Sequence, residues 1–210
     1  ATSAIDFVST SATQQTFEWG GKTTGTVTYK GAGSSIKYLS KHTATPWYAT
    51  IEIQGGAFDT NNQPIDTGVF TQTAGSSKTI TLGSSIINVY PPVSESFNFV
   101  NTSGFAFSFN TAIVNVYRNL TNPTGATFIR VPNTMSNYLT LNVYGGGIMT
   151  MASAGSGAVF KDVSFYGAPI AFGIDDRVQM NASFAVTGTV KIYGYSSSRR
   201  IRVHNGGDFY

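Results

Sequence analysis

The chain has 210 residues, of which 23 are Gly, 49 are Ser or Thr and none is Cys. Only 11% of the residues are charged, with a formal net charge of +3, and 41% are apolar, which favours a buried core over disorder. The lack of Cys excludes disulfides and Cys-based metal sites, and no apolar run is long enough for a membrane-spanning helix.

Apolar and polar residues alternate with a period of two along most of the chain, as they do in strands with one buried face. The first clear case is residues 47–54, where Ile51 and Ile53 alternate with Glu52. The pattern recurs at 96–99, 105–109, 139–143 and 178–186. Turns rich in Gly, Pro and Asn separate these segments, and no segment has helical spacing.

We therefore predict an all-β fold with about fourteen strands. Because alternation is typical of antiparallel sheets covered on one side, we expect a large two-sheet antiparallel sandwich, jelly-roll or immunoglobulin-like. Residues 1–13 are expected to form an N-terminal arm with a short strand pattern, and residues 14–210 a single β-sandwich domain. No internal repeat is detected.

Few residues could support catalysis. Glu52, with Glu18 or Glu95, could form the carboxylate pair of a glycoside hydrolase, but three Glu on outward strand faces are more simply explained as solubilising surface residues. His42 and His204 lie near no nucleophile motif. The sequence therefore predicts a protein that is not an enzyme, with no catalytic residue and no cofactor.

Loop oxygen atoms offer the metal-site candidates. Asp175 and Asp176, and the run Asp59, Asn61, Asn62 and Asp66, could ligate calcium, but no Glu closes the loop that starts at Asp59 at the expected distance. Turns started by Asp and Asn side chains explain this segment better, and we predict no metal site.

The C-terminal end is basic. Lys191, Arg199, Arg200 and Arg202 precede His204 and could contact an anionic partner. Protection of an edge strand by charge is the competing interpretation. With a net charge of +3 and no long basic arm, nucleic acid is the weaker partner.

Two covalent modifications were considered. N-glycosylation sequons begin at Asn101, Asn119 and Asn181, a number that chance alone would give in a chain so rich in Ser and Thr. A Lys–Asn isopeptide bond could replace absent disulfides, although solvated lysines are favoured. The lysines in or beside predicted strands are Lys37, Lys78, Lys161 and Lys191.

The arm carries Ile5, Phe7 and Val8 at a free chain end. Together with the all-β body, low charge and lack of Cys, it resembles the subunits of donor-strand-exchange filaments, such as Cys-free fimbrial pilins and archaeal thread filaments. The resemblance implies a secreted or cell-surface structural subunit that assembles with copies of itself by strand addition and also adheres to glycans or a host surface. In that case Ile5, Phe7 and Val8 would contact the neighbouring subunit.

Two alternatives from other classes remain open. A capsid or spike jelly-roll protein of a virion shares the same composition. A carbohydrate-binding module or jelly-roll glycoside hydrolase would use Trp19, Trp47 or surface Tyr residues to contact sugar rings.

Overall fold

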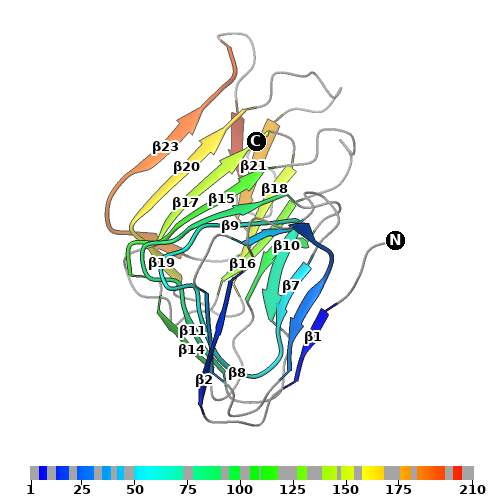
Figure 1. Ribbon diagram of the computed structural model, residues 1–210. Coiled ribbons are helices and arrows are strands. Elements are labelled where there is room, and N and C mark those ends of the chain that lie inside the picture. Colours follow the sequence, from blue (N-terminus) through cyan, green and yellow to red (C-terminus); the bar gives the residue numbers. More distant parts are fainter. Residues whose placement is uncertain are drawn as a thin grey trace.

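The chain winds through successive coils, each of which contributes one strand to each of several sheets (Figure 1). The computed structural model describes residues 5–8, 13–18, 23–30, 35–38, 42–44, 50–72, 78–90, 95–99, 105–108, 110–117, 127–131, 139–145, 148–153, 158–167, 176–180, 184–196 and 201–204. None of the described segments forms a helix that could cross a membrane.

Sheet A runs the whole length of the fold and contains nine strands. They are β1 (Ile5–Phe7), β4 (Val27–Tyr29), β7 (Thr50–Ile53), β10 (Val69–Gln72), β13 (Glu95–Asn98), β16 (Thr127–Val131), β18 (Ile148–Ser153), β21 (Asp176–Met180) and β24 (Ile201–His204).

Sheet C has eight strands and forms a second side. They are β3 (Thr23–Thr24), β6 (His42–Ala44), β9 (Ile65–Thr67), β12 (Ile86–Val89), β15 (Ile113–Tyr117), β17 (Thr140–Tyr144), β20 (Asp162–Tyr166) and β23 (Val190–Tyr193).

A third side is divided between two smaller sheets. Sheet B consists of β2 (Gln14–Phe17), β5 (Ser35–Tyr38), β8 (Gly56–Asp59), β11 (Lys78–Thr81) and β14 (Phe105–Ser108). Sheet D pairs β19 (Ala158–Phe160) with β22 (Phe184–Val186). In chain order β19 and β22 each stand between a strand of sheet A and a strand of sheet C, the place that sheet B strands take in the earlier coils.

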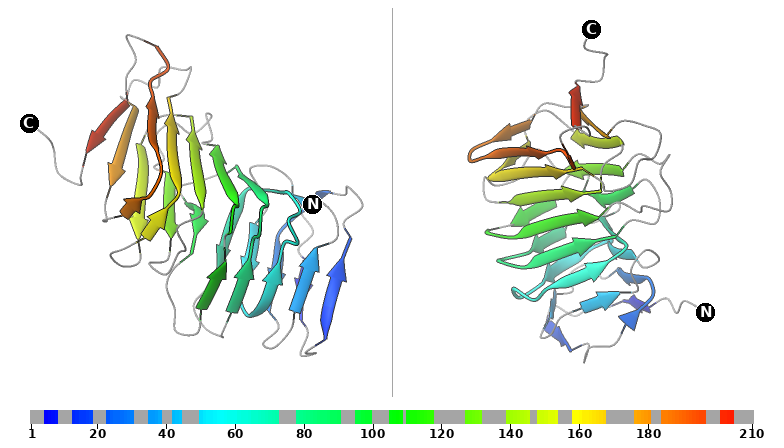
Figure 2. Two further views of the ribbon diagram at one scale, coloured as in Figure 1. Left: turned by 90° about the vertical axis from the view of Figure 1, so that its left-hand side faces the viewer. Right: turned by 90° about the horizontal axis from the view of Figure 1, so that it is seen from above.

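Every pairing between described strands is parallel, so the fold is a parallel β-solenoid (Figure 2). The prediction of a two-sheet antiparallel sandwich, whether jelly-roll or immunoglobulin-like, is therefore wrong. Alternation shows that one face of a strand is buried, but it carries no information about the direction of the neighbouring strand. In a solenoid, a parallel sheet also has one face on the core and one toward solvent.

The predicted alternation itself is confirmed by burial. Ile51 and Ile53 are fully buried, whereas Glu52 between them is partly exposed. The same inside–outside pattern holds on sheet C, where Val114, Val116, Leu141 and Val143 form part of one core.

Coil length explains why no repeat is detected in the sequence. Paired residues of sheet A are 19 positions apart from Ile51 to Phe70, but 32 apart from Phe97 to Ile129. The coils repeat structurally, but their lengths differ, so no single period runs through the whole chain.

Strand β1, the described strand of the N-terminal arm, belongs to the solenoid. β1 pairs in parallel with β4 of its own chain, Ile5 N–H donates to Thr26 O over 2.9 Å, and Lys30 Nζ lies 2.7 Å from Asp6 Oδ2. Exchange of this strand between subunits would have to break these contacts.

Candidate functional site

Five tyrosines occupy the same position on consecutive strands of sheet C. Tyr90 directly follows β12, and the others are the last residues of β15, β17, β20 and β23. Ring centroids of successive neighbours are 4.8, 4.9, 4.6 and 5.0 Å apart, with interplanar angles between 8° and 12°. We call this row the tyrosine ladder; its members are Tyr90, Tyr117, Tyr144, Tyr166 and Tyr193.

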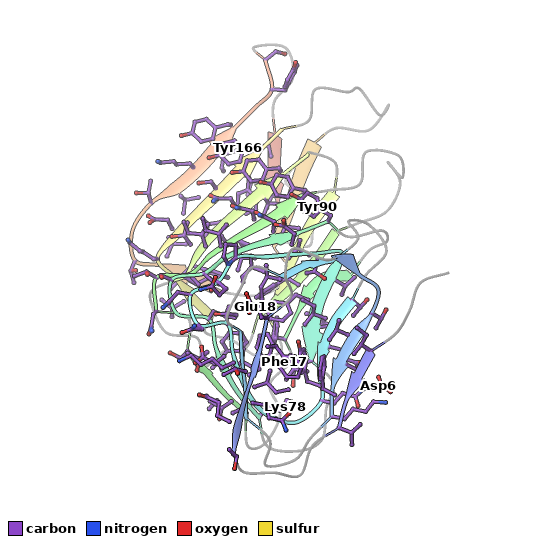
Figure 3. The ribbon with its side chains drawn as sticks, viewed as in Figure 1. Asp6, Phe17, Glu18, Lys78, Tyr90 and Tyr166 are labelled. Atoms are coloured by element: carbon purple, nitrogen blue, oxygen red, sulfur yellow. The ribbon has the colours of Figure 1, made fainter. Side chains whose placement is uncertain are left out.

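The spacing of the ladder follows from strand pairing. Parallel strands lie about 4.8 Å apart, so side chains in register repeat at the distance at which aromatic rings stack. In Figure 3, Tyr90 and Tyr166 lie on the same side of the sheet, near the carboxyl ends of its strands. An inner ring has both faces covered by its neighbours. A ligand therefore meets the ring edges and the hydroxyl groups rather than the ring faces.

A second row of polar side chains runs beside the first. Asn88 Nδ2 donates to Asp66 Oδ1 over 2.7 Å, Asn115 Nδ2 to Asn88 Oδ1 over 2.9 Å, and Asn142 Nδ2 to Asn115 Oδ1 over 2.9 Å. Since an ionised Asp only accepts hydrogen bonds, Asp66 sets the orientation of every amide above it. We call these four residues the amide ladder.

Both ladders lie on the outward face of sheet C. Asn115 and Tyr117 are partly exposed, while Val114 and Val116 beside them are fully buried. Strand register extends the amide row through Ser164 to Lys191, which is exposed. This row is therefore uncharged along its middle, with the carboxylate of Asp66 at one end and the ammonium group of Lys191 at the other, while Asp162 adds a second carboxylate elsewhere on the face.

Three of the ladder hydroxyls, those of Tyr90, Tyr117 and Tyr144, hold their protons more tightly than a free tyrosine. Burial raises the pKa of Tyr90, Tyr117 and Tyr144, and the charge of Asp66 raises that of Tyr90 further. Neutral phenols both donate and accept hydrogen bonds.

The corner between sheets B and C holds the ladder strands in register. Asn61, Gly83 and Asn110 have positive φ angles of 51°, 56° and 43° at equivalent places in three successive coils. A Cβ at Gly83 would overlap Asn62 Oδ1, which accepts hydrogen bonds from the N–H and hydroxyl of Ser84. Glycine at position 83 leaves room for the Asn62 side chain, whereas asparagine adopts the same positive φ in the neighbouring coils.

Three residues considered as calcium ligands, Asp59, Asn61 and Asn62, form turns and hydrogen bonds in this corner. Asp59 Oδ1 accepts the Asn61 N–H over 2.7 Å, closing an Asx turn, and the oxygen of Asn62 binds the next coil as described above. Asp66 is part of the amide ladder. Within the described ranges, no three acidic, His or Cys side chains form a group that could hold a metal ion.

The carboxylates considered for catalysis are not brought together around Glu52. Its register neighbours in the two adjacent coils are Thr28 and Thr71. Glu18 is exposed at the end of β2, and Glu95 begins β13.

The remaining predicted residues are spread over the molecule. Ile5 and Phe7 are half-buried on β1, and Val8 is largely exposed. His42 and Arg202 lie on β6 and β24. The other predicted positions lie outside the described residues: Trp19, Trp47, Asn101, Asn119, Asn181, Arg199 and Arg200.

Lys78 differs from the expectation of a solvated lysine. Its side chain is only 2% exposed, and burial lowers its pKa. Figure 3 shows it far from Tyr166, in the part of the solenoid formed by sheet B.

Sequence reasoning missed both ladders, although a signal for them was present. The tripeptide Asn-Val-Tyr occurs at 88–90, 115–117 and 142–144, with 27 residues between equivalent amides. Ser-Phe-Tyr at 164–166 and Lys-Ile-Tyr at 191–193 continue the series. A search for short motifs at a recurring distance would have found them.

Comparison of the chain with protein-family models, with curated proteins and with solved structures finds no match.

Proposed function

We propose that the protein binds an extended, uncharged polyhydroxylated polymer, namely a polysaccharide, along the two ladders of sheet C. The observation that carries this proposal is the tyrosine ladder, whose five rungs repeat every 4.6 to 5.0 Å on an outward face. Rings that serve only to fill a core would lie on the inward face instead.

The chemistry of the face fits sugar hydroxyls. Phenol groups donate and accept hydrogen bonds, and amides offer both donors and acceptors, as do the hydroxyls of a neutral glycan. A polyanion such as nucleic acid needs a row of cations, whereas the amide row ends in one cation, Lys191, and the face also carries the carboxylates of Asp66 and Asp162.

The periodicity favours a polymer that lies along the solenoid axis, across the strands. Each coil then presents the same pair of groups to successive parts of the ligand, and weak contacts add through multivalency. Because the inner rings have their faces covered, contact through hydroxyl groups replaces the stacking of sugar rings on exposed tryptophans that the sequence suggested.

The test is depletion of the protein from solution by a panel of insoluble neutral polysaccharides. A triple variant, Tyr117→Phe, Tyr144→Phe and Tyr166→Phe, keeps the stacked rings and removes three hydroxyls. We expect at least a tenfold loss of affinity, about 1.4 kcal/mol in total. Tyr195→Phe is the matched control, since Tyr195 is exposed and lies outside the ladder.

Salt dependence separates this proposal from polyanion binding. Binding by neutral hydroxyl contacts should change little between low and high salt, whereas counterion release makes polyanion binding fall steeply. Absence of binding to every polysaccharide, or full binding by the triple variant, would contradict the proposal.

A second candidate function is self-assembly of copies into a filament, and a different observation favours it. Val190 and Ile192 of β23 continue the inward columns of Val163 and Phe165. Those two are fully buried, but Val190 is 49% and Ile192 is 43% exposed. Apolar side chains in such positions favour a covering layer.

We propose that a second copy of the chain covers Val190 and Ile192. Head-to-tail contact keeps all strands parallel, so a copy could extend the sheets without releasing β1 from its own coil, and such a heterologous contact gives an open filament. Ile192→Lys should abolish assembly in sedimentation velocity, while the control Thr189→Lys, at an exposed position nearby, should not. A wild-type protein that stays monomeric at all concentrations would exclude this function.

A further inference from the structure

We propose that the tyrosine ladder is also a site of oxidative cross-linking, at which a peroxidase acting with hydrogen peroxide joins neighbouring rungs as dityrosine. The inference is independent of polymer binding. It concerns bonds between rungs of one chain, and it rests on the geometry of the stack.

Adjacent rings are held in the arrangement that coupling needs. Tyr144 and Tyr166 have ring centroids 4.6 Å apart and planes within 8°, and Tyr166 and Tyr193 are 5.0 Å and 12° apart. The backbones that carry them are paired in register, so the same ring carbon of each tyrosine faces its counterpart. Such fixed proximity replaces a slow encounter between two radicals with an intramolecular step.

Apart from the peroxidase and its hydrogen peroxide, the reaction needs no group that the chain lacks. Each of two phenols gives up one electron and one proton, and the two radicals form a carbon–carbon bond between ring carbons next to the hydroxyls. Each of those carbons then passes its hydrogen to the phenol oxygen, which restores both aromatic rings. The two electrons and two protons reduce hydrogen peroxide to two water molecules.

Access to the oxidant is provided at one end of the ladder. Tyr193 is 47% exposed on β23, whereas the four other rungs are only partly exposed. Oxidation therefore begins at Tyr193, and its nearest phenol, Tyr166, is the first partner.

In a chain without Cys, cross-links between rungs would stabilise the fold in place of disulfides. Each link would tie two neighbouring coils together and reduce the entropy of the unfolded chain, as a disulfide does. For loops of this size we expect a rise in the thermal midpoint of about 5 to 10 °C.

The test treats the dilute full chain with a haem peroxidase and hydrogen peroxide, followed by trypsin. We expect dityrosine fluorescence, a loss of two hydrogen atoms per link, and, for the three rungs nearest the exposed end of the ladder, two joined peptide pairs. Cleavage after Lys and Arg gives peptides 131–161, 162–177 and 192–199, so the pairs are the first with the second and the second with the third.

Two variants separate ladder geometry from exposure. Tyr166→Phe keeps the ring in the stack but cannot couple, so both joined pairs should disappear. Tyr195→Phe removes a phenol that is 57% exposed and outside the ladder, in the same peptide as Tyr193, and should leave the yield unchanged. Circular dichroism of each variant verifies that it folds.

Three results would overturn the proposal: no dityrosine in the wild-type chain, links that join only different molecules, or joined pairs that persist in Tyr166→Phe. Treatment in concentrated urea provides a further control, since unfolding should remove the preference for neighbouring rungs.

Discussion

The solenoid contains two sets of aromatic rings with opposite geometry. In the core, Phe58, Phe70, Phe97 and Phe99 meet at interplanar angles of 53° to 79°, with centroids 4.6 to 6.1 Å apart. In the tyrosine ladder the angles are 8° to 12°. These four rings tilt to fill a volume, whereas the ladder rings repeat by simple translation. At the N-terminal end of the core, the in-register pair Phe7 and Tyr29 also stacks, with planes 9° apart.

The difference shows what each set is for. Core rings come from different sheets and from coils of unequal length, so each has a different neighbourhood, and packing density decides its orientation. Ladder rings come from one position of one sheet. Strand pairing alone sets the regular spacing, so it is the recurrence of Tyr on an outward face, and not the spacing, that favours a role in recognition.

The largest expected effect tests this contrast directly. Phe70 is fully buried, and Phe70→Ala should lower the free energy of unfolding by about 3 to 5 kcal/mol. Tyr117→Ala, on the outer face, should cost about 1 kcal/mol. Urea denaturation of both variants checks the pair. Equal losses would mean that the ladder is as much a part of the stabilising core as Phe70.

A smaller effect is expected from the amide ladder. Asn115→Ala removes two side-chain hydrogen bonds, one donated to Asn88 and one accepted from Asn142. The expected cost is about 1 to 2 kcal/mol in the free energy of unfolding. Thr140→Ala on the same outward face is the control and should cost less. If Asn115→Ala left the free energy of unfolding unchanged, the amide ladder would contribute nothing to the stability of the fold.

The smallest effect concerns pH. A tyrosine whose pKa is higher in the folded state keeps its proton when the unfolded chain has already ionised, so stability is unchanged below about pH 10 and falls as the pH rises further. Urea midpoints between pH 8 and pH 11.5 should show this loss, and Tyr117→Phe should reduce it. An identical loss in Tyr117→Phe and wild type would contradict the raised pKa of Tyr117.

The sequence predicted which side chains face inward but not how the strands pair. The alternation at Ile51 and Ile53 depends on one covered face and holds in the structure. Whether neighbouring strands run parallel or antiparallel depends on where the chain returns after each strand. The segments between strands determine this, and the alternating residues carry no information about it.

The candidate site was missed for a related reason. Asn88, Asn115 and Asn142 are ordinary residues singly and matter only because strand register places them in contact across successive coils. The turn at Asp59, in contrast, is local, and the residues around it are enough to predict it. Contacts across coils require register, which single segments do not reveal.

The shared orientation of the amides gives the face a direction. All three Asn side chains point their N–H groups toward Asp66, so their small dipoles add, as peptide dipoles do in a helix. The carboxylate lies at the positive end of this row, and Lys191 lies at the end toward which the carbonyl oxygens point. A polymer bound as proposed would therefore meet unlike surroundings at its two ends, and the direction of the row predicts that the protein distinguishes the polarity of that polymer.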